Sequence, residues 1–460
     1  MSRSQLTEQE RDQIRKSLVE TRSRRKTQTI KVFELKVNCH QTSKETKLKM
    51  NDCFKQAKWI VNDMLATSKQ TDEKSSIFNY NYLDHKTITR FDKDKNCISS
   101  EISLPVHLHR GIIQQVKTNI INLHKAKEHG RKVGQLKFKS DVSCIPIITG
   151  GIRIIDNSHI TIPGFRNLKV YGLHQILGLK YYELADGKFI KKSSGFYVKC
   201  TVCLNKGKGK GNDVANNKSV GLDFGIKTNI TTSDGEKFNC NVRESEYLKY
   251  LQKQMHRKVK NSRRYCKLKN QIGKEYEHLT NKKTDESNKL ISYLFKNYDM
   301  VYFQDEQISK WKKTKKSKKT NKKCGASFGR NIQCSYLGRI KGKLVSMEGT
   351  RSFKIDKFLP TTKMCPKCGC LNTSITLADR VFRCPCGYTM DRDIHAAQNV
   401  KLFGSTKRAE CLEQASVETL ASTIGSNTDC KLSRRNENEN STIHGGVSSH
   451  QNIITKLLRA

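Results

Sequence analysis

Two closely spaced cysteine pairs constrain the fold of this sequence more than any other feature. The first pair is Cys365-Pro-Lys-Cys368, and the second, Cys384-Pro-Cys386, follows after fifteen residues. Because four thiolates complete the tetrahedral shell of Zn²⁺, this spacing predicts a structural zinc ribbon held by all four side chains. The second pair is CxC rather than the more usual CxxC, so Cys370 is an alternative ligand. A redox-active pair and coincidence are the competing interpretations.

The charge balance predicts the class of partner. Lys and Arg total 87 against 43 Asp and Glu, which gives the 460-residue chain a formal net charge of +44. Such a charge favours a nucleic-acid backbone over an acidic protein or a small anion as the partner. The alternative is an unusually soluble basic protein.

Cysteine usage and hydropathy bear on the compartment. The 17 cysteines are mostly scattered along a long chain, unlike those of a small disulfide-bonded domain. Residues 1–17 contain no apolar stretch typical of a signal peptide, and no apolar run of about 18 residues is present that could cross a membrane. We therefore expect a reducing compartment, no secretion and no membrane partner.

Periodicity and composition shifts divide the chain into five parts. The first half is a basic arm, helical or disordered, followed by a β-rich domain that a helical segment interrupts; the second half is a linker, an α/β domain and a polar tail predicted to be largely disordered. In order, the ranges are 1–28, 29–204 with the helical insertion at about 45–130, 205–218, 219–403, and 404–460.

Several individual elements follow from the same patterns. Alternating apolar residues predict a strand over 30–38 and short strands over 136–203, and residues 68–100 are expected to be loops. MVYFQ at 300–304 is predicted to be a buried strand. Helical spacing predicts helices at 44–67, after LPVHLHR, within 243–296, at 335–346 and at 391–403.

Three acidic residues lie in contexts where a lone carboxylate is costly. Asp223 lies between apolar residues in VGLDFG, Glu306 follows the strand VYFQDE, and Asp393 begins a predicted helix seven residues after Cys386. Brought together, the three carboxylates would bind two divalent cations and support phosphodiester cleavage. Taken singly, Asp223 is equally a turn residue, Glu306 a solvated residue, and Asp393 or Asp391 a helix N-cap.

The order of these features along the chain resembles that of a known protein family. Strand–Asp–hairpin, long helix, strand–Glu, zinc ribbon and Asp on a helix follow one another along residues 30 to 403, and this region resembles TnpB, the transposon-encoded RNA-guided nuclease, and still more its eukaryotic and viral relatives, the Fanzor proteins. GLDFGIKTNITTSDG resembles the first RuvC motif, YDMVYFQDEQISKW the second and CGYTMDRDIHAAQN the third, with PTTKMCPKCG leading into the family's zinc ribbon. His395, where many bacterial members have Asn, favours Fanzor.

The resemblance implies a multidomain fold of α/β and α+β type. An RNase H-like RuvC nuclease domain would occupy 219–403, with the zinc ribbon inserted at 361–390. A β-barrel wedge domain interrupted by a helical recognition domain would precede it.

The resemblance also implies the catalytic residues. Asp223 and Asp393 match the first and third catalytic aspartates, which with a glutamate would hold two Mg²⁺ ions. Gapless alignment puts Gln304 at the glutamate position. Glu306, two residues on and on the same face if the strand continues, is the favoured glutamate, and Glu348 in LVSMEGT is the alternative.

The implied partners are a guide RNA of the omega type, from the end of the transposable element, and double-stranded target DNA with a short adjacent motif. The basic segments 253–269 and 311–323 are candidates for backbone contacts, and Trp311 for base stacking. A solvated helix face, a flexible loop and a core aromatic are the corresponding alternatives.

Further expectations concern assembly, localisation and activity. No coiled-coil heptad is visible, which leaves the oligomeric state open, and we expect a monomer. We expect it in the nucleus if the host is eukaryotic or viral, and otherwise in the cytoplasm. Two functional alternatives remain beside the RNA-guided DNA endonuclease: a DNA transposase on the same RNase H-like core, and an RNA-guided binder whose active site has lapsed.

Overall fold

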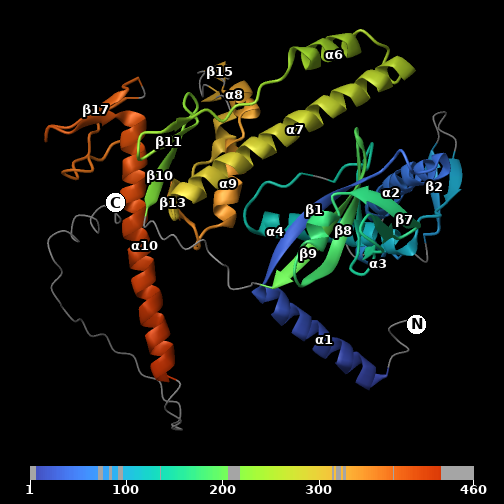
Figure 1. Ribbon diagram of the computed structural model, residues 1–460. Helices are drawn as coiled ribbons and strands as arrows, with labels where there is room; N and C mark the ends of the chain where they lie inside the picture. The colour runs from blue at the N-terminus through green and yellow to red at the C-terminus, as the bar shows by residue number, and fades with distance from the viewer. Residues whose placement is uncertain are drawn as a thin grey trace.

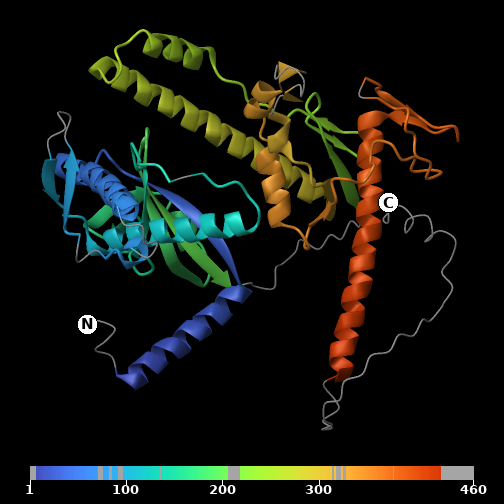
Figure 2. The same ribbon diagram turned by 180° about the vertical axis from the view of Figure 1, so that it is seen from behind.

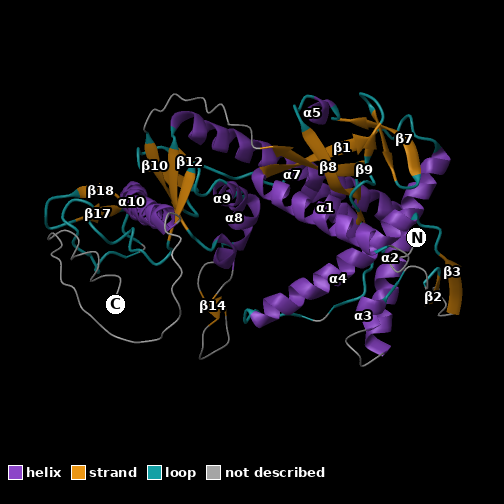
Figure 3. Cartoon of the chain, turned by 90° about the horizontal axis from the view of Figure 1, so that it is seen from below, coloured by secondary structure: helices purple, strands orange, loops and turns teal. Residues whose placement is uncertain are grey.

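The structure is a computed structural model, and it describes residues 7–70, 76–81, 85–91, 97–134, 136–205, 218–312, 315–316, 323–324, 328–376 and 378–425. Two sheets organise the chain (Figure 1). The larger lies in the first half with helices α2 and α4, and the smaller lies in the second half between α7, α9 and α10 (Figures 1 and 2). Seen from below, the strands of the two sheets, drawn in orange, form two separate groups (Figure 3). No helix in the described part of the chain is long and apolar enough to cross a membrane.

The first-half sheet has seven strands, and every pairing in it is antiparallel. Its order is β4 (Cys144–Ile147), β8 (Tyr182–Lys192), β9 (Gly195–Asn205), β1 (Gln28–Val37), β7 (Phe165–Tyr171), β6 (His159–Ile162) and β5 (Arg153–Ile154). Strands β4 and β5 are the two ends of this order, and no ladder joins them among the described residues. Closure into a β-barrel therefore stays a prediction.

Two helices cover this sheet with the apolar faces that the sequence predicts. Helix α2 (Lys44–Gln70) buries Met50, Phe54 and Ile60, and α4 (Val106–Glu128) buries Leu108 and Ile112 in the same core. The helices predicted at these two places are thus confirmed. The short helix α5 (His174–Leu177) follows β7.

The segment expected to be loops between these helices contains regular structure. It forms helix α3 (Ser76–Asn79) and a hairpin of β2 (Thr87–Phe91) with β3 (Cys97–Glu101). The loop prediction is wrong here because Thr87-Ile-Thr and Cys97-Ile-Ser alternate β-branched apolar and polar residues, a pattern too short to stand out from its polar flanks. Residues 71–75, 82–84 and 92–96 lie outside the described part.

The N-terminal arm is helical where it is described. Helix α1 (Glu8–Thr27) begins with a capping box: the side chain of Thr7 accepts from the amide of Glu10, whose carboxylate accepts from the amide of Thr7. Basic residues occupy its last turn, which suits the helix dipole. Of the two open interpretations of the arm, the helix holds for residues 8–27.

The second-half sheet has five strands in the order β12 (Lys237–Phe238), β11 (Ile230–Thr232), β10 (Ser219–Phe224), β13 (Met300–Gln304) and β16 (Ser352–Ile355). Strands β10, β13 and β16 are parallel, whereas β11 and β12 are antiparallel. Helices α6 (Glu246–His256) and α7 (Arg263–Asn297) connect β12 to β13. The 3₁₀ helix Ile308–Lys312, the ladder of Lys315–Lys316 (β14) with Lys323–Cys324 (β15), α8 (Gly329–Cys334) and α9 (Leu337–Ser346) lie between β13 and β16.

Helix α10 (Arg392–Gly425) runs across the small sheet, as Figure 1 shows in red. It packs on β10 at Gly221, where an added Cβ would clash with the backbone oxygen of Ala397 and lie 2.6 Å from the amide nitrogen of Lys401. Farther along, a Cβ at Gly404 would lie 2.9 Å from the Cβ of Tyr302 on β13. Both glycines permit close contact between helix and sheet.

This helix continues past the predicted boundary at 403. The expected disordered tail is therefore wrong for residues 404–425, which contain helix-favouring residues such as those of KRAECLEQ; a polar composition does not by itself prevent a helix. Residues 426–460 lie outside the described part, as do 206–217 of the predicted linker.

The two halves meet where the β8–β9 turn contacts α7. One carboxylate oxygen of Glu277 accepts from the amides of Ser193 (2.6 Å) and Ser194 (3.2 Å), and the other accepts from the hydroxyl of Ser194. At Gly273, one helical turn before Glu277, an added Cβ would lie 2.8 Å from the Cβ of Ser193. The carboxylate thus satisfies two backbone donors of a turn in the other half.

Substitution of Gly221 tests the helix-on-sheet contact. We expect Gly221→Ala to lower the free energy of unfolding by about 1–3 kcal/mol, because the new methyl group meets backbone atoms of α10 that cannot rotate away. The matched control is Gly342→Ala in α9, where a Cβ meets nothing within 4 Å. It should stabilise the helix by up to about 1 kcal/mol. Denaturant titration of both variants checks this, and equal stability of the two would contradict it.

A second prediction concerns the contact between the halves. Glu277→Ala should speed amide hydrogen exchange at Ser193 and Ser194 by about tenfold or more, because both amides lose a charged acceptor. Glu275→Ala, on the same helix, is the control and should leave exchange at this turn unchanged. Unaltered exchange in Glu277→Ala would show that the turn does not depend on this carboxylate.

Candidate active site and metal centre

The two cysteine pairs form two tight turns. Each ends at a glycine with left-handed backbone, Gly369 (φ +74°) and Gly387 (φ +85°), a conformation that favours glycine. The amide of Gly369 donates to the carbonyl of Cys365, and the amide of Gly387 donates to that of Cys384. These turns direct the thiols of each pair to one side.

The four predicted sulfurs meet. Cys365 Sγ lies 3.6 Å from Cys386 Sγ, Cys368 Sγ lies 3.5 Å from Cys384 Sγ, and all four lie within 4.8 Å of one another. A tetrahedral zinc with Zn–S bonds of about 2.3 Å requires sulfurs about 3.8 Å apart, so the donor set and its size fit Zn²⁺. The amide of Tyr388 holds the pKa of Cys386 down, to about 7. Cys370, the alternative ligand, is not a member of this group.

The zinc-ribbon residues pack on the first turns of α10. The hairpin of β17 (Val381–Arg383) and β18 (Thr389–Asp391) buries Phe382, whose ring stacks on His395 with centroids 3.8 Å apart. Burial lowers the pKa of His395 to about 4, so the ring is neutral near pH 7. Tyr388 donates its hydroxyl to Gln398 (2.8 Å).

Asn399 adds a polar attachment. Its Nδ2 donates to the carbonyls of Thr361 and Met364, each at 2.7 Å, in the segment that leads to the first cysteine pair. The ring Nε2 of His395 lies 3.2 Å from the same nitrogen. The helix that carries Asp393 is therefore attached to both ends of the zinc-ribbon segment.

Asp391 and Asp393 have different roles at the start of α10. Asp391 Oδ1 accepts from the amides of Asp393 (2.9 Å) and Ile394 (3.3 Å), and Lys237 pairs with its other oxygen at 2.9 Å. Asp391 is thus the N-cap. The described residues offer the carboxylate of Asp393 no such partner.

Asp223 lies near the carboxyl end of β10, between buried Leu222 and Phe224. Burial and, to a smaller extent, the neighbouring carboxylates of Asp393 and Glu306 together raise the pKa of its carboxyl group to about 8, against the opposing effect of Arg392. Asp393 and Glu306 therefore each lie close enough to Asp223 to disfavour its charged form. Their oxygens are more widely spaced than the cysteine sulfurs, since the cysteines alone, among the described residues, form a group of ligands all within 4.8 Å.

The glutamate does not lie on a strand, as the predicted shared face requires. Strand β13 ends at Gln304, and the amide of Glu306 donates back to the carbonyl of Gln304 at 2.7 Å, a tight turn. The shared-face argument therefore does not hold, although Glu306 still comes near Asp223. Burial raises the pKa of Glu306, and Lys341 opposes the shift.

Gln304 has a structural role at the position where the alignment places the glutamate. Its Nε2 donates to the carbonyls of Asp356 and Leu359, each at 3.1 Å, and its Oε1 accepts from Thr361 Oγ1 at 3.2 Å. Strand register places Leu222 opposite Phe303, so Gln304 follows beside Asp223. Its amide is already used in these three bonds.

Glu348 lies at the amino-terminal end of the parallel strands, away from the carboxyl end where Asp223 lies. It precedes β16, whose first residue Ser352 pairs with Val301, whereas Gln304 pairs with Ile355. Three residues of strand separate these positions by roughly 10 Å. Glu348 is exposed and faces Lys354 at 3.7 Å. The geometry therefore favours Glu306 over Glu348.

Lys341 was not singled out by the sequence. From helix α9 its Nζ donates to Asp305 Oδ1 (2.6 Å) and to the carbonyl of Glu306 (2.7 Å), which holds the turn after β13. In the sequence, Lys341 is one lysine at helical spacing, and nothing distinguishes it from the other lysines of this basic chain.

The predicted basic segments differ in how far they are described. Residues 253–269 span the end of α6, the connecting turn and the start of α7, and most of their cations are exposed. Most of 311–323 lies outside the described part, and Trp311 is half-buried against the core of the small sheet. Phosphate contacts by either segment stay a prediction.

Substitution of single cysteines tests the zinc centre. Cys386→Ser should lose the bound zinc, because an uncharged hydroxyl replaces one of four thiolates, whereas Cys370→Ser should keep one zinc per chain. Elemental analysis of the purified variants measures this directly. Zinc lost from Cys370→Ser and retained in Cys386→Ser would contradict the assignment.

Two family models match the second half of the chain. Residues 202–323 match a family described as "Probable transposase", and residues 337–400 match "Cas12f1-like, TNB domain". The second match contains the four cysteines and Asp393, and the first contains Asp223 and Glu306.

Curated relatives match over similar lengths. A "Putative RNA-guided DNA endonuclease" of Streptomyces pristinaespiralis is 27% identical over 196 residues, covering 41% of this chain and 46% of the relative. Its counterpart InsQ of Escherichia coli (strain K12) is 28% identical over 195 residues, covering 40% and 48%. The chain thus spans just under half the length of these two relatives.

One solved structure is also similar. It is the Cas12f1–sgRNA–target DNA complex determined by cryo-EM, at 13% identity and a TM-score of 0.44, covering 82% of this chain and 99% of that chain. The two family models and the curated relatives thus support the resemblance of this chain to the TnpB-like family over the residues that they match.

Proposed function

We propose that this chain is an RNA-guided DNA endonuclease whose RuvC-type centre cleaves target DNA beside a short target-adjacent motif. The observation that carries the proposal is the convergence of Glu306 and Asp393 on Asp223, with its raised pKa. Crowded, half-buried carboxylates are costly without a cation, and they are the ligand set of two-metal phosphodiester hydrolases. The three parallel strands with two antiparallel neighbours support an RNase H-like interpretation of the small sheet.

Asp223, Glu306 and Asp393 would hold two Mg²⁺ ions. When bound, such ions activate a water and stabilise the leaving oxygen. The chain itself supplies the positions: β10 fixes Asp223, the packing of α10 fixes Asp393, and Lys341 holds the turn that carries Glu306. In this proposal the four-cysteine centre holds Zn²⁺ structurally and takes no part in the chemistry.

The proposed partners follow the charge and the relatives. A guide RNA from the element's end and double-stranded target DNA would bind as a heteroduplex of about 20 base pairs, whose phosphates the +44 charge would neutralise. The first half, as a wedge and recognition region, would hold the guide and the target-adjacent DNA. We propose a monomer, in the nucleus of a eukaryotic or viral host or otherwise in the cytoplasm.

Co-purified RNA tests the guided function. The full chain, expressed with its flanking DNA, should retain one discrete RNA that covers the element's end, and this RNA should direct Mg²⁺-dependent cleavage of matching duplex DNA. Heterogeneous RNA released by moderate salt would contradict the proposal. Joining of the cut end to another DNA would favour the transposase, which the description of one matching family favours.

Substitution of the carboxylates tests the active site. Asp223→Asn or Asp393→Asn should slow cleavage by about a thousandfold or more, because several kcal/mol of metal-dependent stabilisation is lost, while guide and target binding persist. Glu306→Gln should behave likewise, and Glu348→Gln is the matched control, expected to cleave like the unaltered chain. Loss of cleavage in Glu348→Gln alone would overturn the glutamate assignment, and binding without cleavage by the unaltered chain would favour a lapsed active site.

A further inference from the structure

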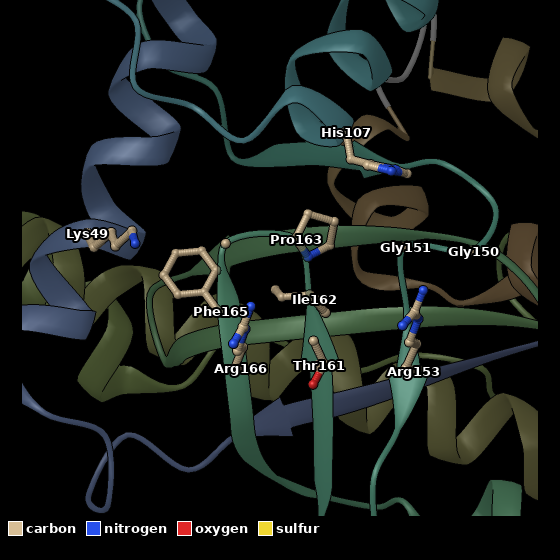
Figure 4. A pocket seen from close by; sticks show the side chains of 11 residues that line it. Lys49, His107, Gly150, Gly151, Arg153, Thr161, Ile162, Pro163, Phe165 and Arg166 are labelled. Atoms are coloured by element: carbon tan, nitrogen blue, oxygen red, sulfur yellow. The ribbon is translucent and has the colours of Figure 1, made fainter. Parts of the chain in front are cut away.

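A pocket of about 540 Å³ lies in the first half of the chain, far along the sequence from the acidic residues (Figure 4). It opens where the β6–β7 turn, the segment before β5 and the start of α4 meet. Its lining comes from α2, α4, β5, β6 and β7 and from two turns, the one at Gly150 and Gly151 and the one at Pro163 and Gly164.

Close packing of turns fixes the walls of this pocket. A Cβ at Gly164, whose φ is +83°, would lie 2.5 Å from Cγ of Pro105, so the β6–β7 turn rests directly against the residue that precedes α4. A Cβ at Gly151 would lie 2.5 Å from Cγ2 of Ile147. Both turns can approach their neighbours this closely only because they carry glycine. This close packing fixes the shape of the pocket.

The floor is apolar and the rim is cationic. Ile162 and Phe165 are buried at the floor, and the ammonium group of Lys49 lies 5.8 Å from the centroid of the Phe165 ring. Lys49 from α2, Arg153 from β5 and Arg166 from β7 have exposed side chains around the opening, as does His107 in the first turn of α4 (Figure 4).

No carboxylate compensates these charges at the pocket. None of its lining residues is acidic, and within the described part of the chain Lys49, Arg153 and Arg166 have no ion-pair partner. By contrast, other cations of the same sheet are paired: Lys192 and Lys199 both contact Glu34. Three unpaired cations from separate elements around one cavity form a site that attracts an anion.

The ligand that fits both the cationic rim and the apolar floor is a nucleotide within a nucleic-acid chain. Phosphate matches the guanidinium forks of Arg153 and Arg166, and a sugar or base face matches the apolar floor, within a volume typical of small-molecule sites. A free phosphate ion would leave the apolar floor unused. We propose that this pocket binds one phosphodiester-linked nucleotide of the nucleic acid that the chain carries, with its phosphate between Arg153 and Arg166. This inference rests on the proposed function only in that a nucleic acid is the partner.

The experiment measures binding of the full chain to a single-stranded RNA and, separately, to a DNA duplex, each about 20 nucleotides or base pairs long. The double variant Arg153→Ala/Arg166→Ala removes the pocket's arginines. The control Lys169→Ala/Lys188→Ala removes the same number of charges from β7 and β8 of the same sheet, outside the pocket. Fluorescence anisotropy over a salt series gives the affinity and its salt dependence, and thermal melting checks that each variant folds.

We expect the pocket variant to bind at least tenfold more weakly than the control in one of the two arms. Its slope of log affinity against log salt should fall by about 0.7 if the pocket takes single-stranded RNA, or by about 0.9 if it takes duplex DNA, because the contact with one phosphate is lost. The nucleic acid whose binding weakens, RNA or DNA, identifies the source of the nucleotide. Equal effects of the pocket and control variants in both arms would overturn the proposal.

Two further readouts separate this inference from the proposed function. Arg153→Lys/Arg166→Lys keeps the charge but removes the guanidinium fork, so it should recover less than half of the lost binding free energy if bidentate contact matters. Full recovery would show a nonspecific charge effect and would overturn the pocket. Because the assay detects binding and not cleavage, an inactive nuclease centre leaves this test unaffected, and a failed pocket leaves the cleavage assay unaffected.

Discussion

The close contact of α10 with β10 at Gly221 is the constraint on which the candidate active site depends. A helix crossing a sheet at ordinary distance would leave room for a side chain between them, and here the backbone of Ala397 and Lys401 occupies that room. The first turn of the helix is thereby brought to the end of β10 where Asp223 lies, and Asp393 comes close enough to raise the pKa of Asp223. The same turn is held from the other side by the cysteine ribbon, through Phe382 on His395 and through Asn399. The four cysteines, the helix and the carboxylate of Asp393 thus form one connected unit. A zinc ion held by the cysteines would act on the candidate active site only by holding this helix in place.

The carboxylates of this unit form a locally negative site in a strongly positive chain. The chain has 87 basic and 43 acidic residues, and most of its charge is therefore positive. Even so, the carboxylates of Asp393 and Glu306 lie near the half-buried carboxylate of Asp223 and raise its pKa. Nearby acidic residues are each neutralised by a lysine, Asp305 by Lys341 and Asp391 by Lys237. Asp223 and Asp393 have no such lysine among the described residues. Local negative charge kept within a strongly positive protein is the arrangement expected where divalent cations and a polyanion must meet.

Sequence patterns identified the elements whose periodicity is strong and the residues whose chemistry is distinctive. The helices at Lys44–Gln70 and Val106–Glu128, strand β13 and the four cysteines followed from spacing alone. What spacing could not give was where a strand ends: Glu306 was expected on a strand face, and a tight turn after Gln304 places it instead. Spacing could not rank Glu306 against Glu348 either, because that choice depends on the parallel register, which puts them at opposite ends of the strands. Sequence patterns missed the hairpin of β2 and β3 because its strands are short and lie between polar segments. They missed the continuation of α10 past 403 because its polar composition indicated disorder. Gly221 gave no signal because the close approach of a helix to a strand is visible only in three dimensions.

Anomalous scattering from crystals of the full chain soaked in Mn²⁺ tests the central claim most directly. The account predicts metal peaks bounded by Asp223, Glu306 and Asp393, two of them about 4 Å apart, in addition to the zinc peak among the four cysteines. Soaked crystals with no manganese peak at Asp223, or with a peak at Glu348 instead, would contradict it.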